Sequence, residues 1–416
     1  MSAITVERLA NGLVVAVEPL PGMATASLCW LVPCGTAGDP EGPAGEGEST
    51  LLSELILRGA GERPSRGWND ALDALGCERR TTANPFHTLM TATALGSRLP
   101  EALPLLMDAV LRPRLDPEHL EPVQRLATQA LEGLTDEPQH LVMLRLSQRF
   151  LPAPYNRTGY GHADGIRSLT MAGLRAAWKR RAVPAGSILA FAGAVDPSTI
   201  LPLVRSLTQV WSGQVDEPAV TRPPVRGSDH LTLPSSQTHL AIALPAPVDS
   251  SPDALSLRLA AMVLGGESSS RLFTEVREKR GLCYSVGGSV SLGRDRGMLQ
   301  IYAGSTPQRA GQTLACIRGE LDRFAKGITH EEFDRARTGL KSRLVMQGES
   351  AAARASTVAG DLFRLGRARS LADTAREVDA LQVERVNEAI GRHWGPGWME
   401  HFTLATIGPA PLDAAR

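Results

Sequence analysis

Two stretches of this chain, residues 95–134 and 303–343, follow the same pattern far apart in the sequence. In each stretch the end of a strand is followed by a helix and then by a second helix, which begins at Asp116 in the first stretch and at Thr329 in the second. Both residues are N-cap candidates with acidic residues in the turn that follows. A copy at this distance predicts that the chain folds as two similar units.

The two halves also end alike. A helix opening at residues 166–170 precedes the strand 187–193, and a helix opening at residues 378–381 precedes the strand 403–408. Strand 87–95 alternates apolar and polar residues, as a half-buried antiparallel strand does. We therefore expect an α+β fold of two homologous halves, each a mainly antiparallel sheet covered by helices on one side.

The boundary between the halves is placed in a segment rich in proline and poor in large apolar residues, 213–230. It contains Pro218, Pro223, Pro224 and Gly227. The sequence thus predicts a first domain over 1–215, a linker over 216–230 and a second domain over 231–416.

Composition excludes several classes of function. Among the 416 residues, Lys plus Arg and Asp plus Glu both number 44, so nothing indicates nucleic acid or an anionic membrane as a partner. No signal peptide is visible, and no apolar run reaches the ~18 residues of a membrane span. The five cysteines are odd in number and scattered, which is typical of reduced thiols in a cytoplasmic protein.

Residues 47–60 have the outline of a metalloprotease zinc helix without its metal-binding residues. The fitting pattern is G-x-x-H-x-x-E-H followed by an apolar frame and a glycine, in which two His ligands and a Glu base share one helical face. Thr50, Ser53 and Glu54 occupy those three positions here, while the apolar frame and Gly59 remain. This stretch alone also fits an ordinary amphipathic helix in an unrelated protein.

Longer motifs reduce that ambiguity. The stretch 264–285 contains Leu-Gly-Gly, Ser-Ser-Arg-Leu-Phe, Glu-Val-Arg-Glu-Lys-Arg-Gly-Leu and Tyr-Ser, and residues 76–100 and 136–138 add further matches. In these motifs the chain resembles the pitrilysin/insulysin family of zinc peptidases, the inverzincins. It looks most like the small bacterial branch that includes the mitochondrial processing peptidase.

The resemblance implies that the zinc site of this chain is degenerate. At the family's spacing, the third ligand position falls on Ala130, which we expect inside the apolar stripe of a helix over 117–134. Together with Thr50, Ser53 and Glu54, this leaves neither a ligand nor the catalytic base. The chain is therefore expected to bind no metal, to need no cofactor and to be inactive alone, with zinc in a partner subunit.

The family's substrate-pairing strand also departs from its pattern. Its positions hold residues 80–84, Arg-Thr-Thr-Ala-Asn, followed by Pro85. A proline in that strand would remove a ladder donor, so addition of a peptide to this edge is doubtful.

Arg277 and Tyr284 match the family pattern in the second half. The resemblance implies that they serve a zinc site on a facing subunit, binding substrate and stabilising the oxyanion. A guanidinium and a phenol both donate hydrogen bonds without titrating near pH 7. Two structural alternatives stay open: Arg277 could complement the dipole in the last turn of a helix over 268–280, and Tyr284 could be a core tyrosine.

Other chemistry is weak. The nine histidines form no metal-binding pair, and Ser268–Ser270 lacks the ending of a phosphate loop, so an N-cap in a tight turn explains it better. The sequence therefore predicts a non-catalytic subunit of a heterodimeric zinc metallopeptidase, with an H-x-x-E-H homologue and a peptide substrate as partners. The alternatives are a structural protein of the same fold, like the core subunits of respiratory complexes, and a lone hydrolase with another site.

Overall fold

The computed structural model describes residues 4–412, which form two compact units. Unit 1 contains the chain up to Gly133, then Ala153–Arg222 and Met346–Ser370. Unit 2 contains Leu134–Pro152, Pro223–Val345 and the chain from Leu371 onward. Each unit therefore takes segments from both halves of the sequence.

Unit 1 is built on a sheet of six strands in the order β1-β2-β8-β3-β7-β6. The strands are β1 (Thr5–Arg8), β2 (Val14–Pro19), β3 (Thr25–Val32), β6 (Glu78–Ala83), β7 (Thr88–Leu95) and β8 (Ile188–Gly193). Only the β2–β8 pair is parallel, so the sheet is mainly antiparallel as predicted. A two-stranded ribbon, β4 (Gly59–Ala60) with β5 (Arg63–Pro64), lies apart from it.

Most helices of unit 1 belong to one core on one face of this sheet, where Trp30 and Phe191 are fully buried. They are α1 (Glu48–Leu55), α2 (Ser65–Asp73), α3 (Leu99–Leu111), α4 (Leu120–Gly133), α6 (Ala163–Ser168), α7 (Met171–Arg181) and α8 (Pro197–Leu207). Short 3-10 turns lie at Thr36–Gly38 and Pro117–His119 in unit 1, and at Leu134–Asp136 and Trp398–His401 in unit 2.

The opposite face of the same sheet carries one helix, α12 (Ala351–Leu365), from the second half of the sequence. Its small apolar stripe, which includes Ala355 and Val358, packs on small strand residues such as Cys29 and Ala190. Small side chains on both surfaces let the helix approach the sheet closely and exclude water.

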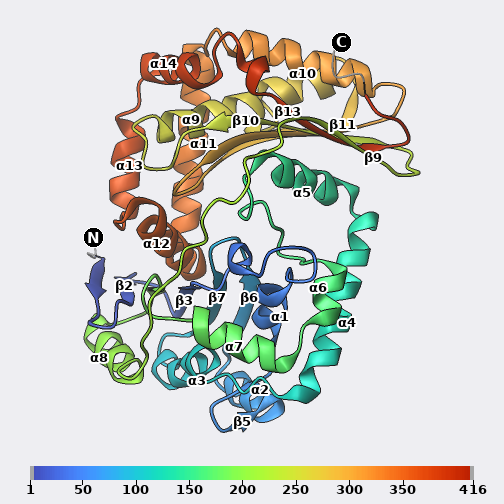
Figure 1. Ribbon diagram of the computed structural model, residues 1–416. Helices are drawn as coiled ribbons and strands as arrows, with labels where there is room; N and C mark the ends of the chain where they lie inside the picture. The colour runs from blue at the N-terminus through green and yellow to red at the C-terminus, as the bar shows by residue number, and fades with distance from the viewer. Residues whose placement is uncertain (1–3, 413–416) are drawn as a thin grey trace. The chain divides into compact units, whose positions relative to one another are not determined.

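Unit 2 repeats this plan with the strand order β11-β12-β10-β13-β9. The strands are β9 (Gly227–Thr232), β10 (Thr238–Ala246), β11 (Cys283–Leu292), β12 (Gly297–Ser305) and β13 (Thr403–Gly408), and only β13–β9 is parallel. Figure 1 shows helices on one side of this sheet and α5 on the other. The helices are α5 (Pro138–Phe150), α9 (Ala254–Ala261), α10 (Ala310–Phe324), α11 (His330–Gly348), α13 (Leu371–Asp379) and α14 (Val383–Trp394).

The two sheets confirm the α+β fold and the internal repeat, since β2-β8-β3-β7-β6 corresponds to β9-β13-β10-β12-β11. The predicted helical layer on one side is present in each unit, and one further helix covers the second face. These further helices are exchanged: α5, from the first half of the sequence, packs on the sheet of unit 2, and α12 packs on that of unit 1.

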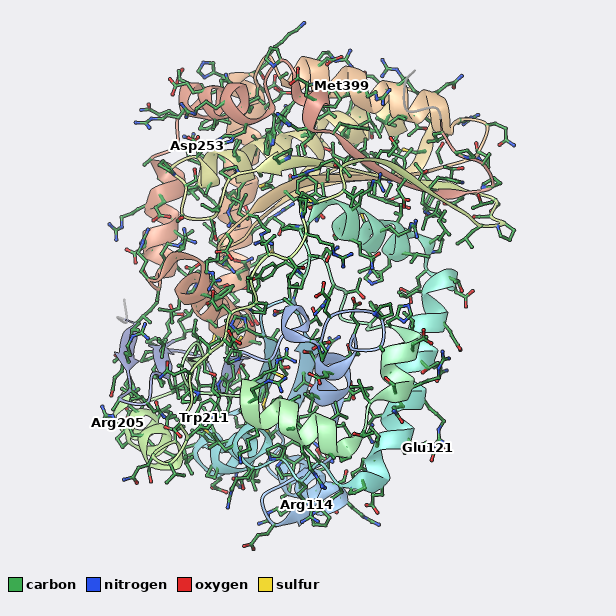
Figure 2. The ribbon with its side chains drawn as sticks, viewed as in Figure 1. Arg114, Glu121, Arg205, Trp211, Asp253 and Met399 are labelled. Carbon is green, nitrogen blue, oxygen red and sulfur yellow. The ribbon has the colours of Figure 1, made fainter. Side chains whose placement is uncertain are left out.

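The segment after α8 is irregular and held to unit 1. The ring of Trp211, labelled in Figure 2, meets Trp30 edge-on at 5.6 Å, and its Nε1 donates to Ala182 O at 3.0 Å. Tyr155 Oη donates to Pro218 O further along. The division of the sequence into 1–215, 216–230 and 231–416 stays a prediction. It describes consecutive stretches of sequence, whereas each compact unit is built from segments of both halves.

Candidate functional site

Arg277 lies in an irregular helix that leads into β11. After Leu272 the helix widens into a π-helical segment, Phe273–Glu278, in place of the regular helix predicted over 268–280. Such widened turns are rare in proteins, and those that do occur are frequently found at functional sites. Gly281, at φ +58°, closes the helix in the left-handed conformation that glycine adopts without strain. The side chain of Arg277 is exposed.

Tyr284 is presented to solvent by a β-bulge. Cys283 pairs with Ser305 on β12, while Ser285 pairs with the adjacent Gly304, so Tyr284 is an extra residue in the ladder. Bulges of this kind turn a side chain out of the regular alternation. Tyr284 is 80% exposed, so it is not a core tyrosine.

The two side chains lie against each other. The Arg277 Cζ atom lies 5.5 Å from the centroid of the Tyr284 ring and 4.7 Å from that of Phe273. These are cation–π distances, which hold a guanidinium in place without consuming its in-plane N–H donors. Within residues 4–412 no carboxylate forms an ion pair with Arg277. A guanidinium and a phenol are thus exposed side by side, able to donate to a peptide carbonyl or an oxyanion.

The neighbouring charges are already paired. Hydrogen bonds from Lys279 and Arg280 lower the pKa of Glu275 to about 2, and both contacts measure 2.6 Å. This cluster leaves Arg277 as the cation of this helix end that is free to bind a ligand. Burial raises the pKa of Cys283 to about 11, so its thiol is protonated at neutral pH and is a poor nucleophile.

The positions predicted for a degenerate zinc site begin on α1. Thr50 Oγ1 donates to Gly159 O at 3.0 Å, and Ser53 Oγ donates to Thr50 O at 2.8 Å. Both hydroxyl protons therefore go to backbone carbonyls. Glu54, the third position, is exposed.

Ala130 lies on α4 but not where the sequence placed it. We expected it inside a buried apolar stripe; it is exposed, and Leu126 is 48% exposed. The stripe that packs on the core is the one through Val123, Ala127 and Leu131, because that face of the amphipathic helix is the one turned toward the interior of unit 1.

These four positions do not fit zinc. Tight zinc sites use imidazole, thiolate or carboxylate, whereas here two positions are hydroxyls bonded to carbonyls and one is an alanine. In the part of the chain from residue 4 to residue 412, no group of three or more His, Cys, Asp or Glu side chains could hold a metal. We therefore derive no catalytic step through a metal bound to this chain.

A polar network that the sequence analysis missed holds α1 in position. Asp39 accepts from the N–H groups of Gly47 at 3.0 Å and Ser49 at 3.1 Å, which are orphan donors of the helix N-terminus. Arg181 Nη1 donates to Asp39 Oδ1 at 3.0 Å and to Glu48 Oε2 at 3.3 Å. Asp39 and Glu48 are both buried. Helix α1 is thus fixed by a buried ion network, which no local pattern could reveal.

Pro85 does not lie in the edge strand β6, contrary to the prediction from the sequence. Pro85 lies beyond the strand, in a turn where Asn84 Oδ1 accepts from the N–H groups of Phe86 and His87 at 2.9 and 2.8 Å. It removes no ladder bond from β6. The edge is nevertheless altered at its end: a Cβ atom on Gly159 would lie 2.9 Å from Ala83 O, so the loop carrying Gly159 runs close to that carbonyl.

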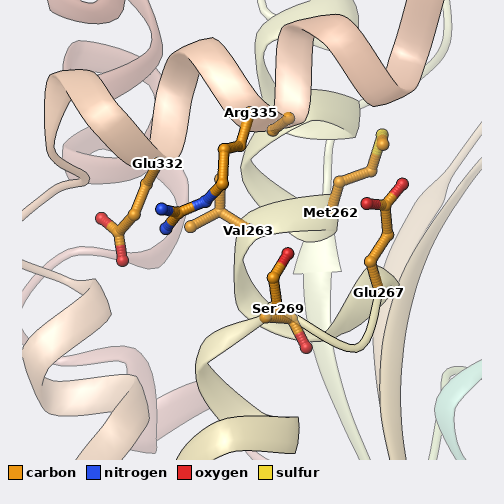
Figure 3. A pocket seen from close by; sticks show the side chains of 8 residues that line it. Met262, Val263, Glu267, Ser269, Glu332 and Arg335 are labelled. Carbon is orange, nitrogen blue, oxygen red and sulfur yellow. The ribbon is translucent and has the colours of Figure 1, made fainter. Parts of the chain in front are cut away.

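The serine-rich loop before Arg271 is not a phosphate site. It borders a small cavity of about 20 Å³, room for about one water molecule, lined by Met262, Val263, Glu267, Ser269, Ser270, Glu332, Arg335 and Ala336 (Figure 3). Arg271, the nearest cation in sequence, is bound to Glu332 through contacts of 2.6 and 2.7 Å. The loop is a turn, as the simpler interpretation predicted, but the predicted N-cap is wrong, because the buried Ser270 Oγ has no hydrogen-bond partner among residues 4–412.

Comparison with known proteins identifies the family to which the chain belongs. The insulinase model of peptidase family M16 matches residues 14–158, and the model of the peptidase M16 inactive domain matches residues 168–340. An uncharacterized zinc protease of Mycobacterium bovis is 32% identical over 410 residues, which cover 96% of this chain and 92% of that protein. The chain therefore belongs to peptidase family M16, and the resemblance inferred from its motifs is confirmed.

Solved structures share the fold. The peptidase M16 inactive domain from Pseudomonas fluorescens has a TM-score of 0.87 at 22% identity, with 99% of each chain covered. A protease from Helicobacter pylori has a TM-score of 0.85 at 18% identity, covering 99% of this chain and 100% of the other.

No helix among the described residues is long and apolar enough to cross a membrane.

Proposed function

We propose that this chain is the non-catalytic subunit of a heterodimeric zinc metallopeptidase in the cytoplasm. Its partner is a homologous subunit that bears H-x-x-E-H and the zinc. This chain supplies Arg277 to hold the peptide backbone and Tyr284 to stabilise the oxyanion at the partner's site.

The observation that supports the proposal most strongly is the exposure of Tyr284 to solvent on a β-bulge. A tyrosine that is 80% exposed on a bulge, stacked with an arginine that has no carboxylate partner among the described residues, has no role in the core of its own unit. Its chemistry suits a site that a second molecule completes. The positions Thr50, Ser53, Glu54 and Ala130 support the other half of the proposal, since they cannot supply a metal site from within the chain.

The alternatives have less support. A purely structural protein of the same fold gives no reason for the exposed Arg277–Tyr284 pair. A lone hydrolase needs an activated nucleophile, and burial raises the pKa values of Cys29, Cys34, Cys77 and Cys283 to about 11. All five cysteines are free thiols, which agrees with a cytoplasmic location.

Coexpression tests the proposal. The chain and an H-x-x-E-H homologue from the same genome should purify as a 1:1 complex that contains one zinc and cleaves peptides. Each subunit alone is the matched control, and we expect neither to be active. A large interface, on the order of 2,000 Å² or more, should keep the complex intact during gel filtration. Separate elution of the two chains, or full activity of the zinc subunit alone, would refute the heterodimer.

A further inference from the structure

Three arginine side chains gather where α5 ends and β9 begins. Arg145 and Arg149 lie one turn apart on α5, and Arg226 directly precedes β9. Among residues 4–412, the one carboxylate that pairs with any of them is that of Asp229 on β9. Three guanidinium charges and one carboxylate charge leave an excess of two positive charges at this corner of unit 2. Such an excess attracts anions from solution.

Asp229 is already engaged by Arg145. Arg145 Nε donates to Asp229 Oδ2 at 2.9 Å, and Nη2 of the same guanidinium donates to the same oxygen. Arg149 Nη1 lies 3.9 Å from Asp229 Oδ1, which is too long for a hydrogen bond. The Nε atom of Arg149 is buried and has no hydrogen-bond partner in the part of the chain that the structure describes. The Arg149 side chain therefore lacks acceptors, and it can turn toward a ligand without breaking a hydrogen bond.

The Arg226 guanidinium lies on an aromatic ring and has no anionic partner. Its Cζ atom is 3.8 Å from the centroid of the Phe150 ring, a cation–π contact that leaves the in-plane N–H donors available. No hydrogen bond or ion pair of Arg226 occurs within the described range 4–412. Partial burial lowers the pKa of Arg226, because its charge is withdrawn from water and no carboxylate compensates. A guanidinium in this position gains more from an added anion than a fully hydrated one does.

Arg149 and Arg226 are neighbours in space. Val225 N donates to Arg149 O at 3.1 Å, and a Cβ atom built on Gly227 would lie 4.0 Å from Arg149 Nη2. The residues on either side of Arg226 thus both approach Arg149, while the Arg226 side chain lies on Phe150, the next residue of α5. Two guanidinium groups that lack acceptors therefore lie within reach of one ligand.

Other arginines of unit 2 do not offer such a site. Arg271 is bound to Glu332, and Arg280 is bound to Glu275. Arg277 has no carboxylate partner among the described residues either, but it belongs with Tyr284 to the site described above. The pair formed by α5 and the start of β9 is therefore a separate excess of positive charge.

We propose that Arg149 and Arg226 together bind a phosphate group, either free phosphate or the phosphate of a small monoester. Planar guanidinium groups bind phosphate oxygens through paired N–H donors, and both arginines have such donors without acceptors. A phosphate monoester has a charge of about −1.5 to −2 at pH 7, which matches the excess of two positive charges. Arg145 adds its positive field while it stays bound to Asp229. This site goes beyond the proposed function, because it requires neither zinc nor a partner subunit.

Calorimetric titration of the purified chain with inorganic phosphate tests the site. We expect one phosphate per chain with a Kd below about 1 mM. Arg149→Gln and Arg226→Gln should each weaken binding at least about tenfold, because each removes a charged pair of donors. Arg66→Gln is the matched control and should bind like the wild-type chain, since Arg66 lies on α2 of unit 1 with its side chain 94% exposed.

A parallel titration with glycerol phosphate distinguishes the two sources of the phosphate group. Binding tighter than that of inorganic phosphate assigns the site to a monoester, and equal or weaker binding assigns it to free phosphate. Both results require that Arg149→Gln and Arg226→Gln weaken the binding that is observed.

Labelling with phenylglyoxal, a reagent for arginine, tests the site without any variant. Phosphate should slow the labelling of Arg149 and Arg226 in the wild-type chain and leave that of Arg66 unchanged, as read by mass spectrometry of peptides. This measurement decides the question if a variant fails to fold. No saturable binding up to about 10 mM, variants that bind like the wild type, or equal protection of Arg66 would overturn the proposal.

Discussion

Removal of Arg354 should release the exchanged helix α12 from the sheet of unit 1. Arg354 and Glu18 on β2 are 2% and 3% exposed, and two hydrogen bonds of 2.9 Å join them. Arg354 also donates to Arg369 O at 3.1 Å. Arg354→Met removes all three bonds and leaves Glu18 buried without its cation.

The expected cost follows from that burial. Breaking one partner of a buried pair typically costs about 3–5 kcal/mol, a large part of the ~5–15 kcal/mol that stabilises a domain. Burial raises the pKa of Glu18 despite the attraction of Arg354, so the ion pair gains little over apolar residues of similar size. The double variant Glu18→Leu/Arg354→Met should therefore lie within about 1 kcal/mol of the wild-type protein.

Hydrogen exchange is the suitable assay, because two units need not unfold in one step. In Arg354→Met, the α12 amides should lose protection equivalent to about 3–5 kcal/mol, and urea unfolding should shift in the same direction. The double variant should restore both. A loss below about 1 kcal/mol in the single variant, or a double variant as unstable as the single one, would refute the reasoning.

Three further outcomes follow from the described contacts. The purified chain alone should hold no stoichiometric zinc and cleave no peptide; metal analysis that finds one tightly bound zinc with chelator-sensitive activity would contradict this. Since the pKa of Glu275 lies at about 2 rather than 4.5, its stabilising contribution is complete above about pH 4.5 and is lost as pH falls through 2. The difference in thermal stability between wild type and Glu275→Gln should therefore vanish near pH 2, and a constant difference would exclude this origin. Asp39→Ala should lower the free energy of unfolding in urea by about 1–3 kcal/mol or more, since it leaves two buried helix N–H groups without their acceptor and leaves Glu48 as the remaining carboxylate partner of Arg181. Asp39→Asn should cost less, and equal losses would argue against the network.

Local signals in the sequence predicted local structure well. Thr329 forms the expected cap at the start of α11: Glu332 N donates to its Oγ1 at 3.2 Å, and Thr329 N donates to Glu332 Oε2 at 2.8 Å. Asp116 stands at its helix start too, but its carboxylate binds Arg114 at 2.7 Å and caps nothing. The helix predicted to open at 378–381 was wrong, because Val378 belongs to the end of α13 and the next helix begins at Val383.

Features that depend on distant partners could not be read from the sequence. The exposure of Tyr284 follows from the register between β11 and β12, which a strand-face argument within β11 ignores. Asp39 and Arg181 are 142 residues apart, yet they meet at the start of α1. Likewise, the exposure of Ala130 depends on which face of α4 meets the core, and the amphipathic pattern was broad enough to include the wrong face.

The most direct test of the account is the catalytic effect of Tyr284 in trans. In the reconstituted heterodimer, Tyr284→Phe removes one hydroxyl with little change in volume, so folding and association should be preserved. If that hydroxyl stabilises the oxyanion at the partner's zinc, kcat should fall roughly 10²-fold. Arg277→Ala should raise KM more than it lowers kcat, because backbone binding is shared by the ground and transition states. Unchanged kinetics in both variants, with the heterodimer intact, would contradict the proposed function and favour a structural role for this chain.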